Sequence, residues 1–169
     1  MEKEITEVYC GNGRGKTTLA IGQALRASSQ GKSVIIIQFL KGNERRELDF
    51  LEELDQLDIK IFRFEKMETC YDQLNEEEQV EEERNILNGL NFARKVIATQ
   101  ECDFLVLDEI LGLLDKHIAT VDMVVGLLKQ KDESMHLILT GNRVDPGILD
   151  YVDSVTTITT LERDKMPLV

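Results

Sequence analysis

The sequence of 169 residues has no tryptophan, only 2 prolines and only 3 cysteines. The few prolines argue against a chain divided by linkers, and the few cysteines argue against a fold held by disulfides. No proline-rich linker, internal repeat or low-complexity segment divides the chain, so we expect one domain over residues 1–169. The cysteines are odd in number and far apart, which argues against a disulfide framework and against zinc ligation by paired cysteines. We therefore expect Cys10, Cys70 and Cys102 to be reduced structural thiols.

Long apolar runs and basic patches are missing as well. The longest apolar stretches, residues 33–40 and 104–107, are far shorter than the roughly 20 residues that span a bilayer. The charged residues 1–4 do not resemble the start of a signal peptide, so we expect a cytoplasmic protein that does not contact a membrane. The net charge of −12 and the lack of a basic stripe argue against nucleic acid as a partner.

What the sequence does contain is an alternation of strand-like and helix-like segments. Apolar and alternating patterns predict strands over residues 5–10, 33–40, 59–64, 103–108, 136–140 and 155–158. Helical spacing predicts helices over residues 16–30, 44–56, 76–99 and 120–131, and a short one that ends at Tyr151 after the Asp145-Pro146 pair. This order indicates an α/β fold of the phosphate-loop NTPase type, with a mostly parallel sheet of about six strands and helices on both faces.

The helix over residues 76–99 has two features of its own. Asn75 is expected to cap its N-terminus, with Glu78 three residues later. Six of its first eight residues are glutamates, which we expect to form a solvated face at the positive end of the helix dipole. We expect five apolar residues to face the core: Val80, Leu87, Leu90, Ala93 and Ile97.

A glycine-rich segment, Gly11-Asn12-Gly13-Arg14-Gly15-Lys16-Thr17-Thr18, lies between the first predicted strand and the first predicted helix. Glycines allow a loop backbone to curl around phosphate oxygens, and a helix N-terminus supplies unpaired N–H groups and a favourable dipole. Lys16 would add a mobile cation and Thr17 a hydroxyl for Mg²⁺. The sequence therefore predicts an ATP-binding phosphate loop.

Two acids support this interpretation, and one position departs from the usual motif. Asp108 and Glu109 come at the carboxyl end of a buried strand, on the same edge of the sheet as the loop, where they can hold a metal or its waters. The usual motif has a glycine at the position of Cys10, so Gly11 comes one place late. On these residues alone the function would be phosphoryl transfer at the γ-phosphate of ATP.

The stretch over residues 9–27 (YCGNGRGKTTLAIGQALRA) resembles the start of the ATP:corrinoid adenosyltransferases of the cobalamin pathway, whose loop is shifted in the same way. Further matches follow in order at residues 31–32, 38–42, 105–110, 139–141 and 148–155. The resemblance thus covers most of the chain, and its most specific parts are the shifted loop and the segment Gln38-Phe39-Leu40-Lys41-Gly42.

This resemblance implies an enzyme that transfers the 5′-deoxyadenosyl group of ATP to the Co(I) of a reduced corrinoid and releases triphosphate, in adenosylcobalamin biosynthesis or salvage. ATP and the corrinoid would be substrates, and Mg²⁺ would assist. Lys16, Thr17 and Glu109 would act in catalysis, and Thr17, Asp108 and Glu109 would hold the metal. Substrate contacts are implied for Asn12, Gly13, Arg14, Gly15, Lys16, Thr17, Thr18, Gln38, Lys41 and Arg143.

The sequence departs from the family pattern in three places. The family carries an aromatic segment with tryptophan that covers the lower face of the corrin, and here only Phe64, Met67 or Tyr71 could take that role. Arg143 comes one place later than the family's arginine after Thr140-Gly141. A Lys-His-Pro segment near the end is replaced by Lys165-Met166-Pro167.

Two alternatives remain open from the sequence: an ATPase or kinase that acts at the γ-phosphate, and a nucleotide-binding regulatory protein without transfer chemistry. The resemblance also implies a homodimer, and a flavoprotein reductase as a possible partner that supplies Co(I). The histidines His117 and His136 are expected to be structural or solvated.

Overall fold

Six parallel strands form the sheet of this protein, whose computed structural model describes residues 4–41 and 48–165. The strand order is β3-β2-β4-β5-β1-β6, and every hydrogen-bonded pair in it is parallel. The strands are β1 (Thr6–Cys10), β2 (Val34–Gln38), β3 (Ile59–Arg63), β4 (Phe104–Asp108), β5 (His136–Thr140) and β6 (Ser154–Thr157). Each lies within about two residues of its predicted position, so the α/β prediction is confirmed.

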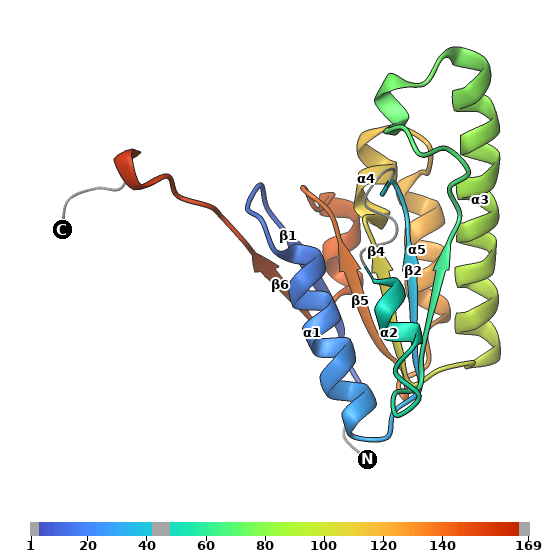
Figure 1. Cartoon of the computed structure of the whole chain (residues 1–169), viewed down its shortest axis with the longest axis vertical. Coiled ribbons are helices and arrows are strands. Elements are labelled where there is room, and N and C mark those ends of the chain that lie inside the picture. Colours follow the sequence, from blue (N-terminus) through green and yellow to red (C-terminus); the bar gives the residue numbers. More distant parts are fainter. Residues whose placement is uncertain (1–3, 42–47, 166–169) are drawn as a thin grey trace.

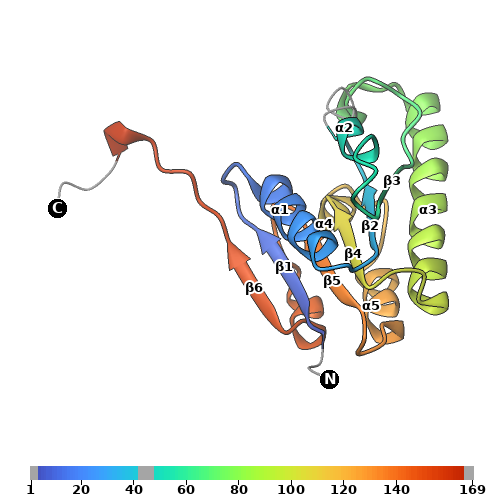
Figure 2. The same ribbon diagram turned by 60° about the horizontal axis from the view of Figure 1, so that its bottom comes forward.

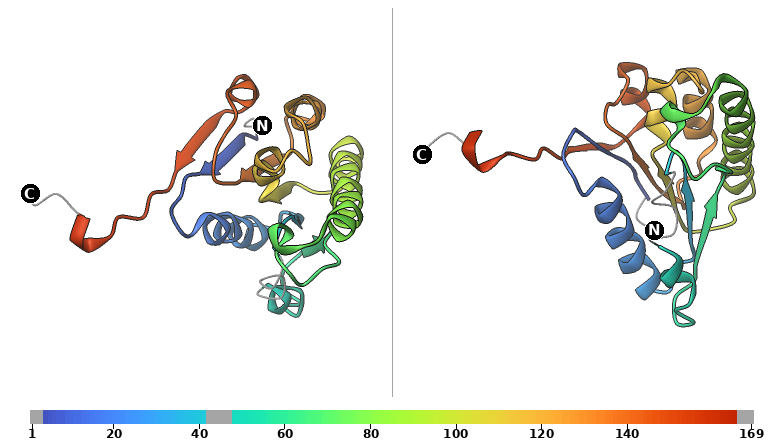
Figure 3. Two further views of the ribbon diagram at one scale, coloured as in Figure 1. Left: turned by 90° about the horizontal axis from the view of Figure 1, so that it is seen from above. Right: turned by 45° about the horizontal axis from the view of Figure 1, so that its top comes forward.

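Helices cover both faces of this sheet, as Figures 1 and 3 show. One face carries α1 (Lys16–Ser29) and α2 (Asp49–Glu52), and the other carries α3 (Glu76–Thr99) and α5 (Val121–Gln130). A short helix α4 (Ile110–Asp115) follows β4, and a 3₁₀ helix (Pro146–Tyr151) follows β5. None of the described helices is long and apolar enough to cross a membrane.

Strand β4 shows why a short apolar sequence forms a central strand of this sheet. All five of its residues are buried. Leu105 and Leu107 belong to the core under α3 and α5, whereas Phe104 and Val106 belong to the core under α1. Successive side chains of a strand point to opposite faces, so a strand covered on both sides must be apolar at every position. The only charged residue of β4, Asp108, is its last, at the edge where the phosphate loop lies.

The helices agree with the sequence predictions in part. Asn75 and Glu78 form the expected reciprocal cap on α3, with both backbone-to-side-chain distances 3.0 Å. The helix predicted over residues 44–56 is much shorter, because α2 spans only Asp49–Glu52, and residues 42–47 lie outside the described part of the chain. Helix α4 was not predicted from the sequence. The expectation for Val80 was wrong, because its side chain is 59% exposed.

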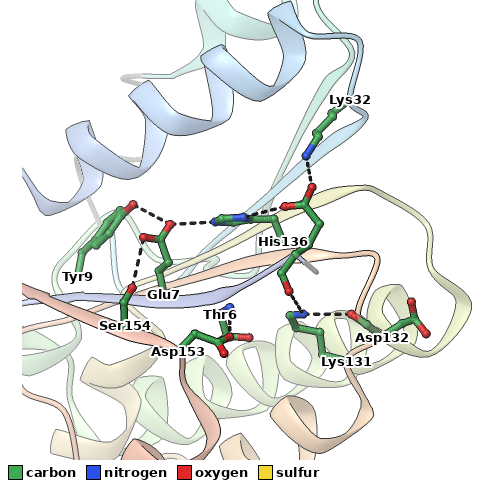
Figure 4. Close-up of polar contacts among 10 residues, drawn as sticks. Thr6, Glu7, Tyr9, Lys32, Lys131, Asp132, His136, Asp153 and Ser154 are labelled. Carbon is green, nitrogen blue, oxygen red and sulfur yellow. Dashed lines mark hydrogen bonds and ion pairs between the residues drawn. The ribbon is translucent and has the colours of Figure 1, made fainter. Parts of the chain in front are cut away.

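His136 is the first residue of β5, at the edge of the sheet opposite the phosphate loop, and it has a structural role as expected. Figure 4 shows its ring in contact with Glu7. Its Nδ1 lies 3.2 Å from Glu4 Oε2, and its Nε2 lies 2.9 Å from Glu7 Oε2. Its ring stacks on Phe104 with centroids 4.6 Å apart. Burial opposes ionisation of Glu4, but the contacts with Lys32 and His136 outweigh burial and lower the pKa of Glu4. These contacts tie β5 to β1 and to the residues before it.

Candidate phosphate-binding site

The glycine-rich segment forms a loop between β1 and α1, at the carboxyl edge of the sheet (Figure 2). Gly11 and Gly15 have φ values of 108° and 101°, in the left-handed region that residues other than glycine rarely adopt. Leu19 is the first residue of α1 whose N–H bonds back along the helix, to Gly15 O at 2.8 Å. The amides before it have no intrahelical acceptor, which suits an anion such as phosphate.

The segment that follows β6 lies against the outer side of this loop. The N–H of Gly13 donates to Ile158 O at 2.9 Å, and the N–H of Arg14 donates to Thr160 Oγ1 at 3.0 Å. A Cβ atom on Gly11 or Gly13 would lie 2.2 or 2.6 Å from Ile158 O. This close approach requires glycine at both positions, and Gly11 is the glycine that comes one place late in the motif.

Lys16 lies over the loop from the first turn of α1. Its Nζ donates to Gly11 O at 2.8 Å and to Gly13 O at 3.0 Å. The ammonium group is thus held above the concave side of the loop by two carbonyl oxygens, each of which can be exchanged for a phosphate oxygen. The arrangement suits the phosphate contact that the sequence predicted for Lys16.

Asp108 forms the centre of the polar contacts beside the loop. Its carboxylate is fully buried. Four side chains from three segments donate to it: Thr17 Oγ1 at 2.9 Å, Thr140 Oγ1 at 2.7 Å, Gln38 Nε2 at 3.1 Å and Lys41 Nζ at 2.9 Å. A buried carboxylate is tolerated when it is paired and its lone pairs are satisfied, as they are here.

Glu109 differs from its neighbour because no described residue donates a hydrogen bond to its carboxylate. Its backbone has φ of 63°, and its N–H donates to Thr140 Oγ1 at 2.8 Å. Burial raises the pKa of Glu109, the charge of Asp108 adds to this effect, and Lys41 and Lys16 oppose it. An oxygen ligand without a hydrogen-bond partner among the described residues is therefore available at this edge of the sheet.

These groups fit a hard divalent cation such as Mg²⁺, which prefers oxygen ligands. The Thr17 hydroxyl, Asp108 and Glu109 supply three such groups from the loop and from the end of β4. No cluster of three or more His, Cys, Asp or Glu side chains suited to a metal occurs in the part of the chain that the structure describes. A cation held here would therefore also need waters or phosphate oxygens as ligands, which is the usual situation for Mg²⁺.

A second chain of contacts extends from Gln38, which is 2% exposed. Its Oε1 accepts a hydrogen bond from Arg63 Nε at 3.1 Å, and Arg63 Nη2 lies 2.9 Å from Asp49 Oδ1 in an ion pair. Gln38 and Arg63 are partners in the parallel register of β2 and β3. The sequence predicted Gln38 but not Arg63, since only the strand pairing brings the two together.

A hollow of about 260 Å³ lies beside the loop, lined by Thr17, Thr18, Ile21, Gln38, Lys41, Leu48 and Phe50. Its polar residues come from the phosphate loop and the end of β2, and its apolar residues come from α1 and from the residues around α2. A molecule with an anionic part and an apolar ring could contact both sides.

Arg143 does not join the Asp108 centre. Its side chain is 79% exposed and forms an ion pair with Asp115, with Nη2 and Oδ1 2.8 Å apart. Both residues line a separate hollow of about 360 Å³ at the end of α4. Asn12, Arg14 and Thr18 are exposed on the loop, where a ligand could reach them.

The three candidates for the lower corrin face differ in position. Phe64 is partly buried and packs against the core, with its ring centroid 5.5 Å from that of Phe92. Tyr71 is half-buried, its hydroxyl donates to Glu83 Oε1 at 2.5 Å, and burial together with Glu83 raises its pKa to about 12. Met67 is half-buried in the same segment. Phe64 is therefore already used in packing, and Met67 and Tyr71 remain candidates.

The glutamate run of α3 is not simply a solvated face, so that expectation was wrong in part. Glu82 is 3% exposed, and its carboxylate accepts hydrogen bonds from the N–H groups of Lys66 at 2.9 Å and Met67 at 3.0 Å. Glu81 forms an ion pair with Lys66 at 2.8 Å. With Glu83 on Tyr71, three consecutive glutamates hold the segment that contains both remaining candidates.

We expect Glu82→Gln to lower the free energy of unfolding by about 1–3 kcal/mol, because one of the two N–H groups that bond to this buried side chain then faces an amide NH₂ instead of an oxygen. Urea unfolding measures this loss, and limited proteolysis should show faster cleavage near Lys66. The matched control is Glu77→Gln, an exposed change in the same run. Equal stabilities of the two variants would contradict the structural role of Glu82.

Comparison with protein families matches residues 2–165 to ATP:corrinoid adenosyltransferase BtuR/CobO/CobP. The corrinoid adenosyltransferase of Escherichia coli is 30% identical over 162 residues, which cover 93% of this chain and 77% of that protein. The corrinoid adenosyltransferase CobA of Salmonella typhimurium is 28% identical over 160 residues, with the same coverage of 93% and 77%.

Among solved structures, the KaiC-like protein PH0186 of Pyrococcus horikoshii is similar, with a TM-score of 0.65. The match covers 97% of this chain and 75% of that one, at 19% sequence identity. At this identity the likeness shows the fold alone.

Proposed function

The chain belongs to the ATP:corrinoid adenosyltransferase family BtuR/CobO/CobP, and from this premise we propose that it transfers the 5′-deoxyadenosyl group of ATP to the Co(I) of a reduced corrinoid. The observation that carries the proposal is the family match over residues 2–165, which includes both the shifted phosphate loop and the Asp108 centre. The specific type proposed is a cob(I)alamin adenosyltransferase, and residues 1–169 act as one domain.

The reaction is a substitution at the 5′ carbon of ATP. The electron pair of Co(I) forms the cobalt–carbon bond, the bond between C5′ and the triphosphate oxygen breaks, and its electron pair leaves with the triphosphate. No proton is transferred, so the protein needs no general base. The protein contributes by positioning the substrates and by stabilising the charge on the leaving group.

In this proposal the phosphate loop binds the triphosphate as a leaving group. Lys16 exchanges its two carbonyl contacts for phosphate oxygens, and the unpaired amides at the start of α1 bind further oxygens. The loop residues that contact the triphosphate are Asn12, Gly13, Arg14, Gly15, Lys16, Thr17 and Thr18. Ile21, Leu48 and Phe50 line the hollow beside the loop, and we propose that the adenosine part of ATP contacts them.

Mg²⁺, held by Thr17, Asp108 and Glu109, would supply additional positive charge to the departing triphosphate. Gln38 and Thr140 keep the Asp108 carboxylate in place through their hydrogen bonds. Arg143, in its exposed position next to Asp115, is proposed as a corrin contact, and Met67 or Tyr71 as the side chain below the corrin.

The proposal also covers the setting of the enzyme. We expect a cytoplasmic homodimer that receives Co(I) corrinoid with the help of a flavoprotein reductase. These expectations follow from the resemblance of the chain to this family of enzymes. Measurement of the molecular mass of the purified protein in solution tests the homodimer.

One assay tests the proposed reaction. The protein is incubated anaerobically with MgATP and a chemically reduced corrinoid, and the visible spectrum and the phosphate product are followed. We expect a light-sensitive alkylcobalt spectrum and release of triphosphate. ADP and inorganic phosphate formed without corrinoid would instead indicate cleavage at the γ-phosphate, and binding without turnover would indicate a regulatory protein.

A further inference from the structure

Lys41, which follows the end of β2, has a side chain that is almost completely buried. Its Nζ lies 2.9 Å from Thr17 Oγ1 and 2.9 Å from Asp108 Oδ2, and its side chain is only 9% exposed. A buried ammonium group needs an ionised partner, because desolvation of an unpaired charge costs several kcal/mol. Among the described residues, Lys41 therefore supplies the positive charge that balances the buried Asp108 carboxylate.

The two oxygens that Lys41 contacts are two of the protein ligands that fit the divalent cation. An ammonium group and a metal ion cannot both occupy the space between the same hydroxyl and the same carboxylate. We propose that Lys41 is a resident cation, which fills the metal position while nucleotide is absent and leaves it when the metal arrives together with ATP. This inference rests on the proposed function only in taking MgATP as the ligand.

The local structure allows such a movement. The N–H of Lys41 donates to the Glu65 carboxylate, which fixes the backbone, and Leu40 before it has φ of 55°. The side chain beyond this anchor is a flexible four-carbon stem with a single charged end. It lines the same hollow as Thr18, so the ammonium group can turn from Asp108 toward a bound triphosphate without movement of the backbone.

The charges decide the order of events. A divalent cation that approaches alone must displace a paired lysine and meets that lysine's positive charge a few ångströms away, which is unfavourable in a buried site. A cation that brings a triphosphate also brings negative charges that the released ammonium group can contact. The nucleotide-free protein should therefore bind a divalent cation poorly at this site, and removal of the lysine should create a metal site.

Titration with Mn²⁺, followed by electron paramagnetic resonance of the free ion, tests this inference without nucleotide, corrinoid or turnover. Mn²⁺ has the oxygen preference of Mg²⁺ and reports its own binding. We expect no tight site in the wild-type protein. In Lys41→Met we expect one site, with an affinity for Mn²⁺ roughly tenfold or more above that of the wild-type protein. The same increase is expected for Lys41→Gln, which keeps a polar end should the methionine variant fold poorly.

Two further variants separate this site from the general attraction of an acidic protein for cations. Lys32→Met removes a different lysine–carboxylate pair, at the opposite edge of the sheet, and should leave Mn²⁺ binding as in the wild type. The double variant Lys41→Met with Asp108→Asn removes both charges and should lose the new site. Tight Mn²⁺ binding by the nucleotide-free wild type, or unchanged binding in both Lys41 variants, would overturn the inference, whatever the adenosylation assay shows.

Discussion

Lys16→Ala is expected to reduce adenosylation by roughly 10³-fold, the largest effect of any single change at the loop. The Lys16 ammonium group already lies above the concave side of the loop, where the leaving triphosphate would bind. Alanine removes this positive charge. The effect should fall mainly on kcat, because charge on the leaving group grows as the C5′–O bond breaks. Triphosphate release with a saturating reduced corrinoid measures it.

The fold of this variant should be nearly unaffected. In the free protein the Lys16 ammonium group contacts only two loop carbonyl oxygens among the described residues, and water can replace it there. Lys32→Ala, at the opposite edge, serves as the control of equal charge. Turnover of Lys16→Ala within a few-fold of the wild type would contradict the assignment of the phosphate loop.

Asp108→Ala is expected to have the largest effect on stability, about 3–5 kcal/mol, because it leaves the buried Lys41 charge without a partner. Thr17, Thr140 and Gln38 lose an acceptor at the same time. Domains of this kind are stable by only about 5–15 kcal/mol in total, so the variant should be close to unfolding at moderate temperature. Urea unfolding followed by circular dichroism measures the change.

A second substitution distinguishes the lost charge pair from the lost volume. If the unpaired Lys41 charge causes most of the damage, adding Lys41→Met to Asp108→Ala should restore much of the lost stability, although the contacts of Thr17, Thr140 and Gln38 with Asp108 are still missing. If the double variant is no more stable than Asp108→Ala, the cavity rather than the charge dominates. A loss below about 1 kcal/mol in Asp108→Ala would contradict the central role of this carboxylate.

The sequence was most informative where a local pattern determines the structure. Apolar runs such as that of β4 identify buried strands without knowledge of their neighbours, and Asn75 with Glu78 identifies a helix start. The phosphate loop and the acids Asp108 and Glu109 were found in the same way, because a strand end and a helix start each have a local signature.

Contacts between distant segments could not be found in this way. Arg63 meets Gln38 only because β3 pairs with β2, and Thr140 meets Asp108 only because β5 lies beside β4. Glu82 looked like one of several solvated glutamates, and nothing in its neighbours in sequence reveals that it is buried and accepts hydrogen bonds from two backbone N–H groups. These residues depend on strand order and on loop paths, which single-sequence periodicity does not encode.

The contact of the phosphate loop with the segment after β6 has a consequence for how the protein acquires its site. The N–H of Arg14 bonds to a residue 146 positions later, and β1 gains its second neighbour only when β6 has paired with it. Contacts that close long stretches of chain form late, because their entropic cost must be met first. The phosphate loop precedes β6 by more than 130 residues and is thus among the last parts to reach its final shape, and a chain whose β6 has not yet been synthesised should not hold nucleotide.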